Sequence, residues 1–437
     1  MKHLSIAILT LSFLFSCTDN SPMVFEEESQ AIVNEITVAK GTRASNISDD
    51  EEDILTEDFS EGSILYISQM GTSETPNFPN GHSATNTQQP KNLYAYGWSE
   101  DNDTSADWNA GYNFKSITDY NPIEWNIIKS YGNVGNAFSL YAMYFPGDQK
   151  VRFNVEDDQT VKANFMKSDI MGAYHATSSL YTRLRFRLFH LMVYLRVTLY
   201  VPVYRDGLSE DNKEMKYSGF KPTTGDGENI PTVYVMNACT GFNIEWRANR
   251  SSDTEAPLTQ PNGNSKADIK MYSHSSNAGK KDSDIDYINV SDYLSDYYNG
   301  NSFPGECECE HKDGNSCEVC GCQLKEDETC SGCGCDKVYV YNFSVLFPAQ
   351  DFGDNNLLCF ALQAPDGSKK YYYFHGSQIV GESGNYSLTQ GTLQHLYLYL
   401  PRTTNETILV GANILPWADA VTDMTVTKQE SEQDKKD

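Results

Sequence analysis

The sequence predicts an all-β protein built as two stacked β-sandwich domains, and three observations lead to that class. Runs of β-branched and aromatic residues of strand length recur at 64–67, 140–145, 233–235 and 338–347. In the last run every second residue is large and apolar, which is the period of a strand. Loops rich in Gly, Asn, Asp and Pro separate the runs, an arrangement typical of sandwiches. At 437 residues, and with about 150 residues per domain, the chain has room for two or three units.

The composition excludes some functions. The formal net charge is −27, with 60 acidic against 33 basic residues, so the surface repels the phosphates of nucleic acids. A hydrophobic content of 39% and an aromatic content of 12% suffice for real cores.

The N-terminal residues predict export and a lipid anchor. Lys2 and His3 precede an apolar run, 4–15, that is too short to cross a bilayer, which takes about 20 helical residues, so it reads as a secretion signal. The run ends in Leu14-Phe15-Ser16-Cys17, which resembles the bacterial lipobox, with a bulky Phe where Ala or Ser is usual. We expect Cys17 to carry the lipid on the outer membrane; the alternative is an ordinary signal with a chance cysteine.

The rest of the chain divides by composition. We expect a lipoprotein signal peptide at 1–16, then a tether with a candidate propeptide strand at 17–50. An N-terminal β-sandwich follows at 51–178, and a C-terminal β-sandwich at 179–425 carries a Cys-rich loop insertion at 305–337. Residues 426–437 form a polar tail.

Two segments need a closer reading. Leu184, Leu188, Leu191 and Leu195 have helical spacing, yet 191–201 alternates without a break, so we expect strands with one slip of phase near Phe189. Residues 357–363 and 370–374 flank Pro-Asp-Gly and predict a hairpin.

A cysteine cluster is the exceptional local feature. Eight of the eleven cysteines follow a 13-residue repeat in which Cys-x-x-Cys-x-Cys recurs: Cys307, Cys309, Cys317, Cys320, Cys322, Cys330, Cys333 and Cys335. Because so few apolar residues cannot form a core, the repeat predicts a cross-linked knob.

The nature of the cross-links stays open. Eight thiolates fit two tetrahedral Zn sites, with His311 as a further candidate ligand, and eight cysteines equally make four disulfides. An exported location favours disulfides.

Motifs of catalysis are missing: there is no G-x-S-x-G, H-E-x-x-H or phosphate-binding loop. Asp101, Asp103 and Asp107 loosely resemble a Ca²⁺ loop but lack its glycine and glutamate, which favours an acidic surface loop. Some of the 28 tyrosines, or Trp98, could stack on sugars, although half-buried strand tyrosines are the more common case.

Several segments together resemble the fimbrillin-like (Mfa/FimA-type) surface lipoprotein family of Bacteroidetes. In chain order they are Gly41-Thr42-Arg43-Ala44, Phe59-Ser60-Glu61-Gly62-Ser63, Tyr141-Ala142-Met143-Tyr144-Phe145-Pro146, Asp169-Ile170-Met171-Gly172-Ala173, Leu188-Phe189-His190 and Ile414-Leu415-Pro416-Trp417. Several depart from the family pattern, with Ser63 in place of Asp and Leu188 in place of Phe. Their order and spacing carry the resemblance.

The resemblance implies two transthyretin-like sandwich domains and a non-catalytic role as a pilus subunit, tip component or adhesin. Its partners would be other pilus subunits or surface ligands. It also implies a cut between Arg43 and Ala44, as in pilins that are processed after a basic residue, and packing roles for His190 and Trp417. The alternatives are a glycan-binding lipoprotein of a polysaccharide-uptake system and a metal-sequestering surface protein.

Overall fold

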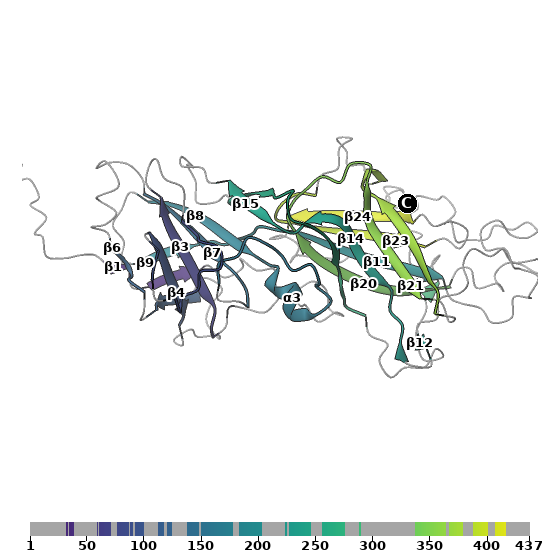
Figure 1. Cartoon of the computed structure of the whole chain (residues 1–437), viewed down its shortest axis with the longest axis horizontal. Helices are drawn as coiled ribbons and strands as arrows, with labels where there is room; N and C mark the ends of the chain where they lie inside the picture. Colours follow the sequence, from purple (N-terminus) through teal and green to yellow (C-terminus); the bar gives the residue numbers. More distant parts are fainter. Residues whose placement is uncertain are drawn as a thin grey trace, which may run out of the picture.

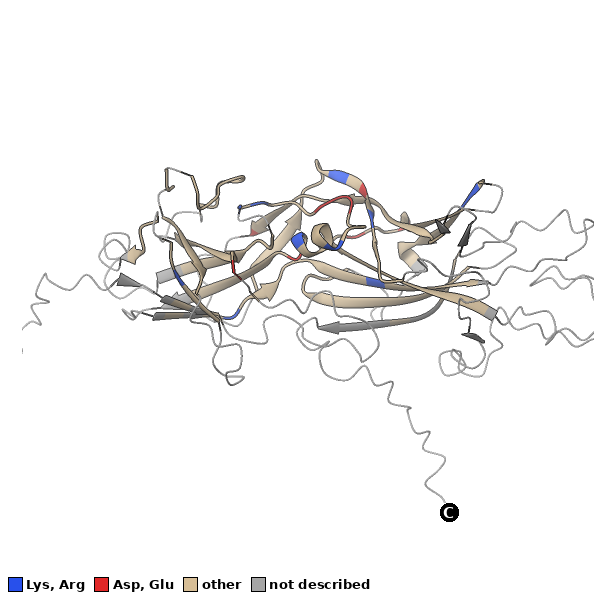
Figure 2. Cartoon of the chain, turned by 90° about the horizontal axis from the view of Figure 1, so that it is seen from below, with Lys and Arg blue, Asp and Glu red and all other residues tan. Residues whose placement is uncertain are grey.

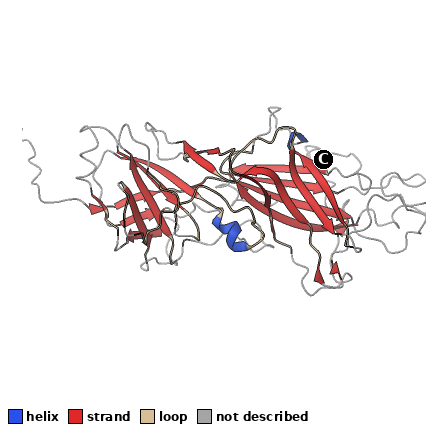
Figure 3. Ribbon diagram, viewed as in Figure 1, coloured by secondary structure: helices blue, strands red, loops and turns tan. Residues whose placement is uncertain are grey.

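Figure 1 shows the computed structural model of the protein. The described residues are 32–38 except 34, 59, 61–70, 77–99 except 87 and 91, 112–117, 120–124, 138–147, 150–177, 183–202, 223–224, 227–245, 256–275, 288–289, 337–363, 367–378, 388–400 and 407–416. They form two groups of β-strands joined by an irregular connector (Figure 3). The predicted all-β class is confirmed.

The first group is one eight-stranded sheet with the order β10-β8-β7-β3-β4-β5-β2-β9. In that order its strands are β10 (Phe189–His190), β8 (Met171–Thr177), β7 (Phe138–Tyr144), β3 (Ile64–Met70), β4 (Leu93–Trp98), β5 (Tyr112–Ser116), β2 (Glu35–Val38) and β9 (Arg183–Phe186). A short pair, β1 (Ile32–Val33) and β6 (Ile123–Glu124), lies beside it. All pairings in the large sheet are antiparallel except β2 with β9.

The topology shows that this sheet folds over on itself. Only Arg187 and Leu188 separate β9 from β10, yet these strands occupy opposite edges of the sheet. The two edges must therefore meet, and the enclosed face holds a core whose members are Ile36, Val38, Phe59, Leu65, Ile67, Tyr94, Tyr96, Phe114, Leu140, Met171, Leu184 and Phe186, among others. This is the first sandwich.

The second group consists of two facing sheets. One has the order β18-β20-β11-β23-β24, with β19 also on β20, and its strands are β18 (Tyr272–Ser273), β20 (Lys337–Phe347), β11 (Val193–Pro202), β23 (Thr392–Tyr399), β24 (Ile408–Pro416) and β19 (Ile288–Asn289). The other has the order β17-β14-β21-β22, with β17 (Lys266–Lys270), β14 (Thr232–Cys239), β21 (Asn356–Gln363) and β22 (Lys369–His375). Charged residues are few on most of these strands (Figure 2), and β17 is the exception with Lys266, Asp268 and Lys270.

Local patterns predicted the central strands correctly. The alternating residues of β20, from Tyr339 to Phe347, all lie in the core between the two sheets. The predicted hairpin is β21 with β22, paired at Leu358↔Phe374. The ambiguous segment around Leu188 is strands, as expected, with breaks on both sides of β10.

Smaller elements complete the described part. Two-stranded sheets pair β12 (Thr223–Thr224) with β13 (Gly227–Glu228) and β15 (Phe242–Glu245) with β16 (Leu258–Pro261). A short helix, α3 (Lys162–Lys167), and a 3₁₀ turn, η4 (Gly376–Gln378), were not predicted. A helix of this length that buries a single residue, Phe165, leaves no periodic pattern in the sequence.

Two expected domain limits differ from the strand pairing. The limit at 178 falls short of the first sheet, because β9 and β10 pair with β2 and β8. The limit expected at 51 leaves out β2, which lies inside that sheet and falls within 17–50, where we expect a candidate propeptide strand. The physical reason is the same in both cases: the partners of a strand are set by contacts distant in sequence, and local composition does not encode them.

The two ends of the cysteine-rich segment are hydrogen-bonded neighbours. Asn289 ends β19 and is the register partner of Lys337, which begins β20. The segment between them lies outside the described residues, but its ends are as close as paired strands require, about 5 Å between Cα atoms. The expected insertion at 305–337 therefore overlaps β20 by Lys337 only.

We expect replacement of residues 290–336 by Asn-Gly to leave the fold intact, because a two-residue turn closes antiparallel strands in this register. Far-UV circular dichroism and the thermal midpoint of the variant should match those of the parent protein. As a control, replacing residues 364–368, which connect the register partners Gln363 and Lys369 of the β21–β22 hairpin, by the same dipeptide tests tolerance to turn grafting. A variant that loses its β-sheet signal would show that the segment belongs to the core.

Candidate functional site

Strand β2 is the feature of the first domain with the clearest functional meaning. It lies between β5 and β9, with Ile36 opposite Phe114 on one side and Leu184 on the other. Ile36 and Val38 are fully buried in the enclosed core. The strand thus fills a place that two neighbouring strands and a core require.

The residues expected to be processed or cross-linked lie outside the described part of the chain. These are Cys17, Arg43, Ala44 and the eight clustered cysteines. Val38 ends β2 five positions ahead of Arg43, so a cut after Arg43 would leave β2 on the N-terminal fragment.

The structure brings together two of the segments that carried the family resemblance. Asp169, before β8, and His190, in β10, are both buried, and the Asp169 Oδ1 to His190 Nδ1 distance is 2.6 Å. The ring of His190 is held by a carboxylate inside the protein, which agrees with the packing role expected for it. A buried pair of this kind orients two strand ends and is costly to break.

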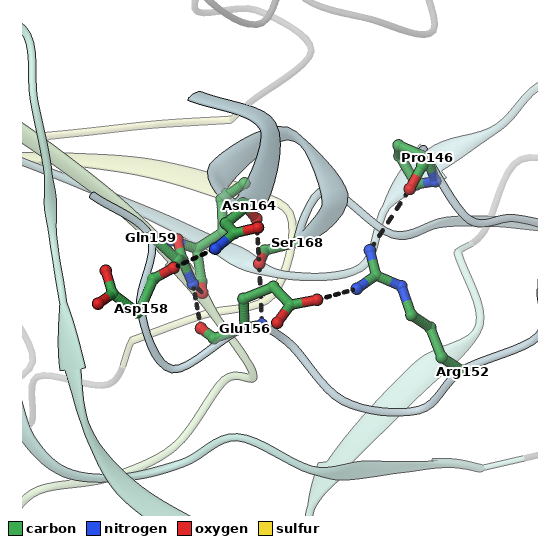
Figure 4. Close-up of polar contacts among 8 residues, drawn as sticks. Pro146, Arg152, Glu156, Asp158, Gln159, Asn164 and Ser168 are labelled. Carbon is green, nitrogen blue, oxygen red and sulfur yellow. Dashed lines mark hydrogen bonds and ion pairs between the residues drawn. The ribbon is translucent and has the colours of Figure 1, made fainter. Parts of the chain in front are cut away.

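The described residues of the connector between the two groups of strands are 146–147 and 150–170, and Figure 4 shows polar contacts among them. Its beginning bonds to the first domain, where Gly81 N–H donates to Val151 O and Val151 N–H donates to His82 O. Its middle bonds to the second domain, where Val155 N–H donates to Thr240 O and Lys270 N–H donates to Asp157 O.

Side chains within the connector stabilise its path. Arg152 Nη1 donates to Glu156 Oε1 at 3.0 Å, and Ser168 Oγ accepts from Glu156 N–H and donates to Asn164 O. The ion pair of Lys270 with Asp158, at 3.0 Å, is about half exposed on both sides and contributes little.

Gln159 is the central residue of the connector. Its side chain is fully buried, Nε2 donates to Leu346 O at 2.7 Å, and Oε1 accepts from Leu346 N–H at 3.0 Å. Along the same edge of β20, His274 N–H donates to Asn342 O, where β18 runs alongside. Strand β18 does not extend as far as Leu346. The side-chain amide of Gln159 therefore makes the two hydrogen bonds to Leu346 that a neighbouring strand would make.

The outer face of the larger sheet in the second domain carries a polar layer that is mostly buried. Its members are Arg196 and Thr198 on β11, Asn342 and Ser344 on β20, His395 on β23 and His274 beyond β18. Thr198 Oγ1 donates to Asn342 Oδ1 at 2.7 Å and must therefore accept from His395 Nε2, which is 2.7 Å away. The proton of His395 is thus on Nε2, and its buried Nδ1 has no partner.

Both histidines of the polar layer are held neutral. Burial, reinforced by the Arg196 cation, lowers the pKa of His274 to about 3. Burial, reinforced by Arg196 and then His274, lowers the pKa of His395 well below its usual value. In the unfolded chain both titrate near about 6.5, so the unfolded state binds more protons than the folded state below that pH.

We expect the stability of the second domain to fall as the pH drops from about 6.5 toward 3, and to be unaffected by these groups above 6.5. One histidine with a strongly lowered pKa contributes about 2 kcal/mol of that loss between pH 7 and 5. Denaturant unfolding of His274→Gln at both pH values should show a smaller loss by about that amount. His375→Gln, on partly exposed β22, is the control; equal pH dependence in His274→Gln and the parent would contradict the assignment.

Other candidate residues have structural surroundings. Trp98 is half-buried and packs against the core of the first sheet. The acidic loop with Asp101 lies outside the described residues. Among the described residues, no group of three His, Cys, Asp or Glu could hold a metal ion, and no helix is long and apolar enough to cross a membrane.

Sequence reasoning did not find Gln159 or the polar layer. A single glutamine gives no local signal, and the layer draws residues from strands up to two hundred positions apart. The alternation of β11 does place Arg196 and Thr198 on the face opposite its valines and leucines.

Comparisons with known proteins return similar structures only. No family model matches the chain, and no curated protein matches its sequence. A solved protein assigned to cell adhesion from Bacteroides uniformis is 11% identical, with a TM-score of 0.40, over 88% of this chain and 97% of that one. A fimbrial assembly protein from Parabacteroides distasonis is 11% identical, with a TM-score of 0.32, over 87% and 98%.

The tip fimbrial protein Mfa3 from Porphyromonas gingivalis is 5% identical, with a TM-score of 0.28, over 81% of this chain and 94% of that one.

Proposed function

We propose that the protein is a non-catalytic cell-surface lipoprotein that acts as a fimbrillin-like pilus subunit, tip component or adhesin. The observation that carries the proposal is the place of β2: an N-terminal strand fills the interior of a sheet, shortly before a basic residue in a polar segment. A strand from a neighbouring subunit could occupy the same place through main-chain hydrogen bonds, which is how β-augmentation gives affinity.

Surface location is supported by the short apolar signal and Cys17. We propose attachment to the outer membrane by acyl chains on that cysteine, because two or more chains hold a protein far better than one. The cysteine-rich segment would then stand on the exported side, where disulfides persist. Intact mass before and after reduction, with and without a chelator, separates four disulfides from bound Zn.

We expect Cys17→Ala to release the protein from membranes or to leave its signal uncut, because alanine offers no thiol for acylation at the lipobox position. Membrane fractionation with immunoblotting measures this, and Cys239→Ala is the matched control because that cysteine is buried in β14. Normal processing together with unchanged membrane retention of Cys17→Ala would refute the anchor.

The pilus role has a separate test. Surface material from cells that express the protein should contain filaments in electron micrographs and a heat-resistant polymer on gels. A protein found only as lipidated monomer would exclude the subunit role and leave that of a monomeric adhesin.

A further inference from the structure

The outer face of the β17-β14-β21-β22 sheet carries a row of tyrosines. Tyr234 on β14 and Tyr373 on β22 are both register partners of Cys359 on β21, so they lie on the same face on either side of it. Tyr371 lies two residues from Tyr373 on that face and is 45% exposed, the most exposed aromatic residue of the described core strands. We call Tyr234, Tyr371 and Tyr373 the tyrosine strip.

The side chains between these rings are small. Cys359 is opposite both Tyr234 and Tyr373, and Ala361 is opposite Thr232 and Tyr371. The thiol of Cys359 is neutral, because burial raises its pKa to about 11. The strip therefore consists of aromatic rings on either side of small, uncharged side chains. The strands that carry Tyr234 and Tyr373 are about 10 Å apart, and Tyr371 and Tyr373 are about 7 Å apart along β22.

The position of the tyrosine strip on the sheet excludes some classes of ligand. The backbone groups of β14 and β21 are taken by neighbouring strands on both sides. At the β22 edge, Tyr373 O already accepts from the N–H and the Oγ1 of Thr407, so a ligand on this face contacts side chains. An added peptide strand needs main-chain groups at a sheet edge. A second folded protein usually needs about 800 Å² per partner, well above what three partly buried tyrosines offer. A narrow polymer whose units are rings with flat faces fits the tyrosine strip better than a peptide strand or a folded protein does.

The charge near the strip points to an acidic ligand. Exposed Lys369 lies two residues before Tyr371, and Lys270 is the register partner of Tyr234. Lys266 is exposed on the same face, which also holds Asp268, whose Oδ1 accepts from Asn237 N–H, and Lys270 is already paired with Asp158 at 3.0 Å. Lys369 and Lys266 against Asp268 therefore leave a basic excess of one. In a chain of net charge −27, this basic excess is a local exception.

We propose that the tyrosine strip binds an acidic polysaccharide. Pyranose rings would stack on Tyr371 and Tyr373, and a uronate carboxylate would contact Lys369. The proposal rests on the surface location proposed above but not on polymerisation, and it names a ligand class for the adhesin role.

Binding of the purified full chain to immobilised polygalacturonate tests it, with dextran as the neutral polymer and polyglutamate as the acidic polymer without rings. We expect retention on polygalacturonate alone at low salt. Tyr371→Ala should weaken it about tenfold, while Tyr371→Phe keeps it, because the ring and not the hydroxyl makes the contact. Lys369→Ala should weaken it about threefold and reduce its salt dependence, and Lys162→Ala, on α3, should change nothing.

Several results would overturn the proposal. Absence of retention on polygalacturonate, or equal retention of Tyr371→Ala and the parent, removes the site. Equal retention on polyglutamate shows attraction of charge without recognition of rings. Self-association that Tyr371→Ala abolishes, with no polymer binding, assigns the strip to contacts between copies. Because none of these measurements needs filaments, failure here leaves the pilus role to its own test.

Discussion

Val38→Asp is expected to unfold the first domain. Val38 is fully buried between Tyr112 on β5 and Phe186 on β9, inside the enclosed core. The substitution removes apolar contacts and places a carboxylate there without an ionic partner, which costs at least about 4 kcal/mol. Limited proteolysis followed by mass spectrometry should show cleavage within residues 61–177 under conditions in which the parent resists.

Val161→Asp is the matched control. The same change is made at a valine that is 58% exposed and stands at the N-cap of α3, where an aspartate is well tolerated. Its stability should be within about 0.5 kcal/mol of the parent. If Val38→Asp were as stable as Val161→Asp, β2 would not be part of the folded domain, and the proposed role of this strand would fail with it.

The same strand makes the proposed cut at Arg43 testable. If the chain is cut there, the fragment with β2 stays bound by core contacts until another strand replaces it, since its departure would expose Phe114 and Leu184. N-terminal sequencing of surface material should then find Ala44. Recovery of only the Cys17 end would refute the cut and favour an anchor or accessory role.

The sequence was sufficient to predict strands that alternate over many residues. In β20 and in the β21–β22 hairpin, one buried face imposes a period of two, and local turn residues set the connection. Strand existence was therefore predictable, whereas the neighbours of short strands were not. The four residues of β2 lie between strands that begin at Tyr112 and Arg183, and nothing near Glu35 specifies either partner.

For the residues of the candidate site, too, the sequence predicted some features and not others. Asp169 and His190 were singled out in separate motifs, and only the fold shows that they form one contact. The histidines of the polar layer owe their low pKa values to burial and to Arg196, which are properties of three strands together. Gln159 carried no pattern, because its role depends on an edge of β20 that β18 leaves uncovered.

Gln159→Ala is expected to destabilise the protein by about 2–5 kcal/mol. The substitution leaves the N–H and the C=O of Leu346 without their partner in a site where Leu346 is fully buried, and each such group costs about 1–3 kcal/mol. It also frees the connector from the second domain at its central contact. Urea unfolding measures the loss, and a transition that splits into two steps would show that the domains no longer unfold together.

Two further variants separate the hydrogen bonds from the packing. Gln159→Glu keeps the shape, but an ionised carboxylate cannot donate to Leu346 O, whereas its protonated form can, so the stability of this variant should recover relative to the parent as the pH falls. Thr160→Ala, at the exposed neighbouring position, should cost less than about 0.5 kcal/mol. A Gln159→Ala protein as stable as Thr160→Ala would show that water replaces the amide at this edge, and that the connector is held by its backbone contacts alone.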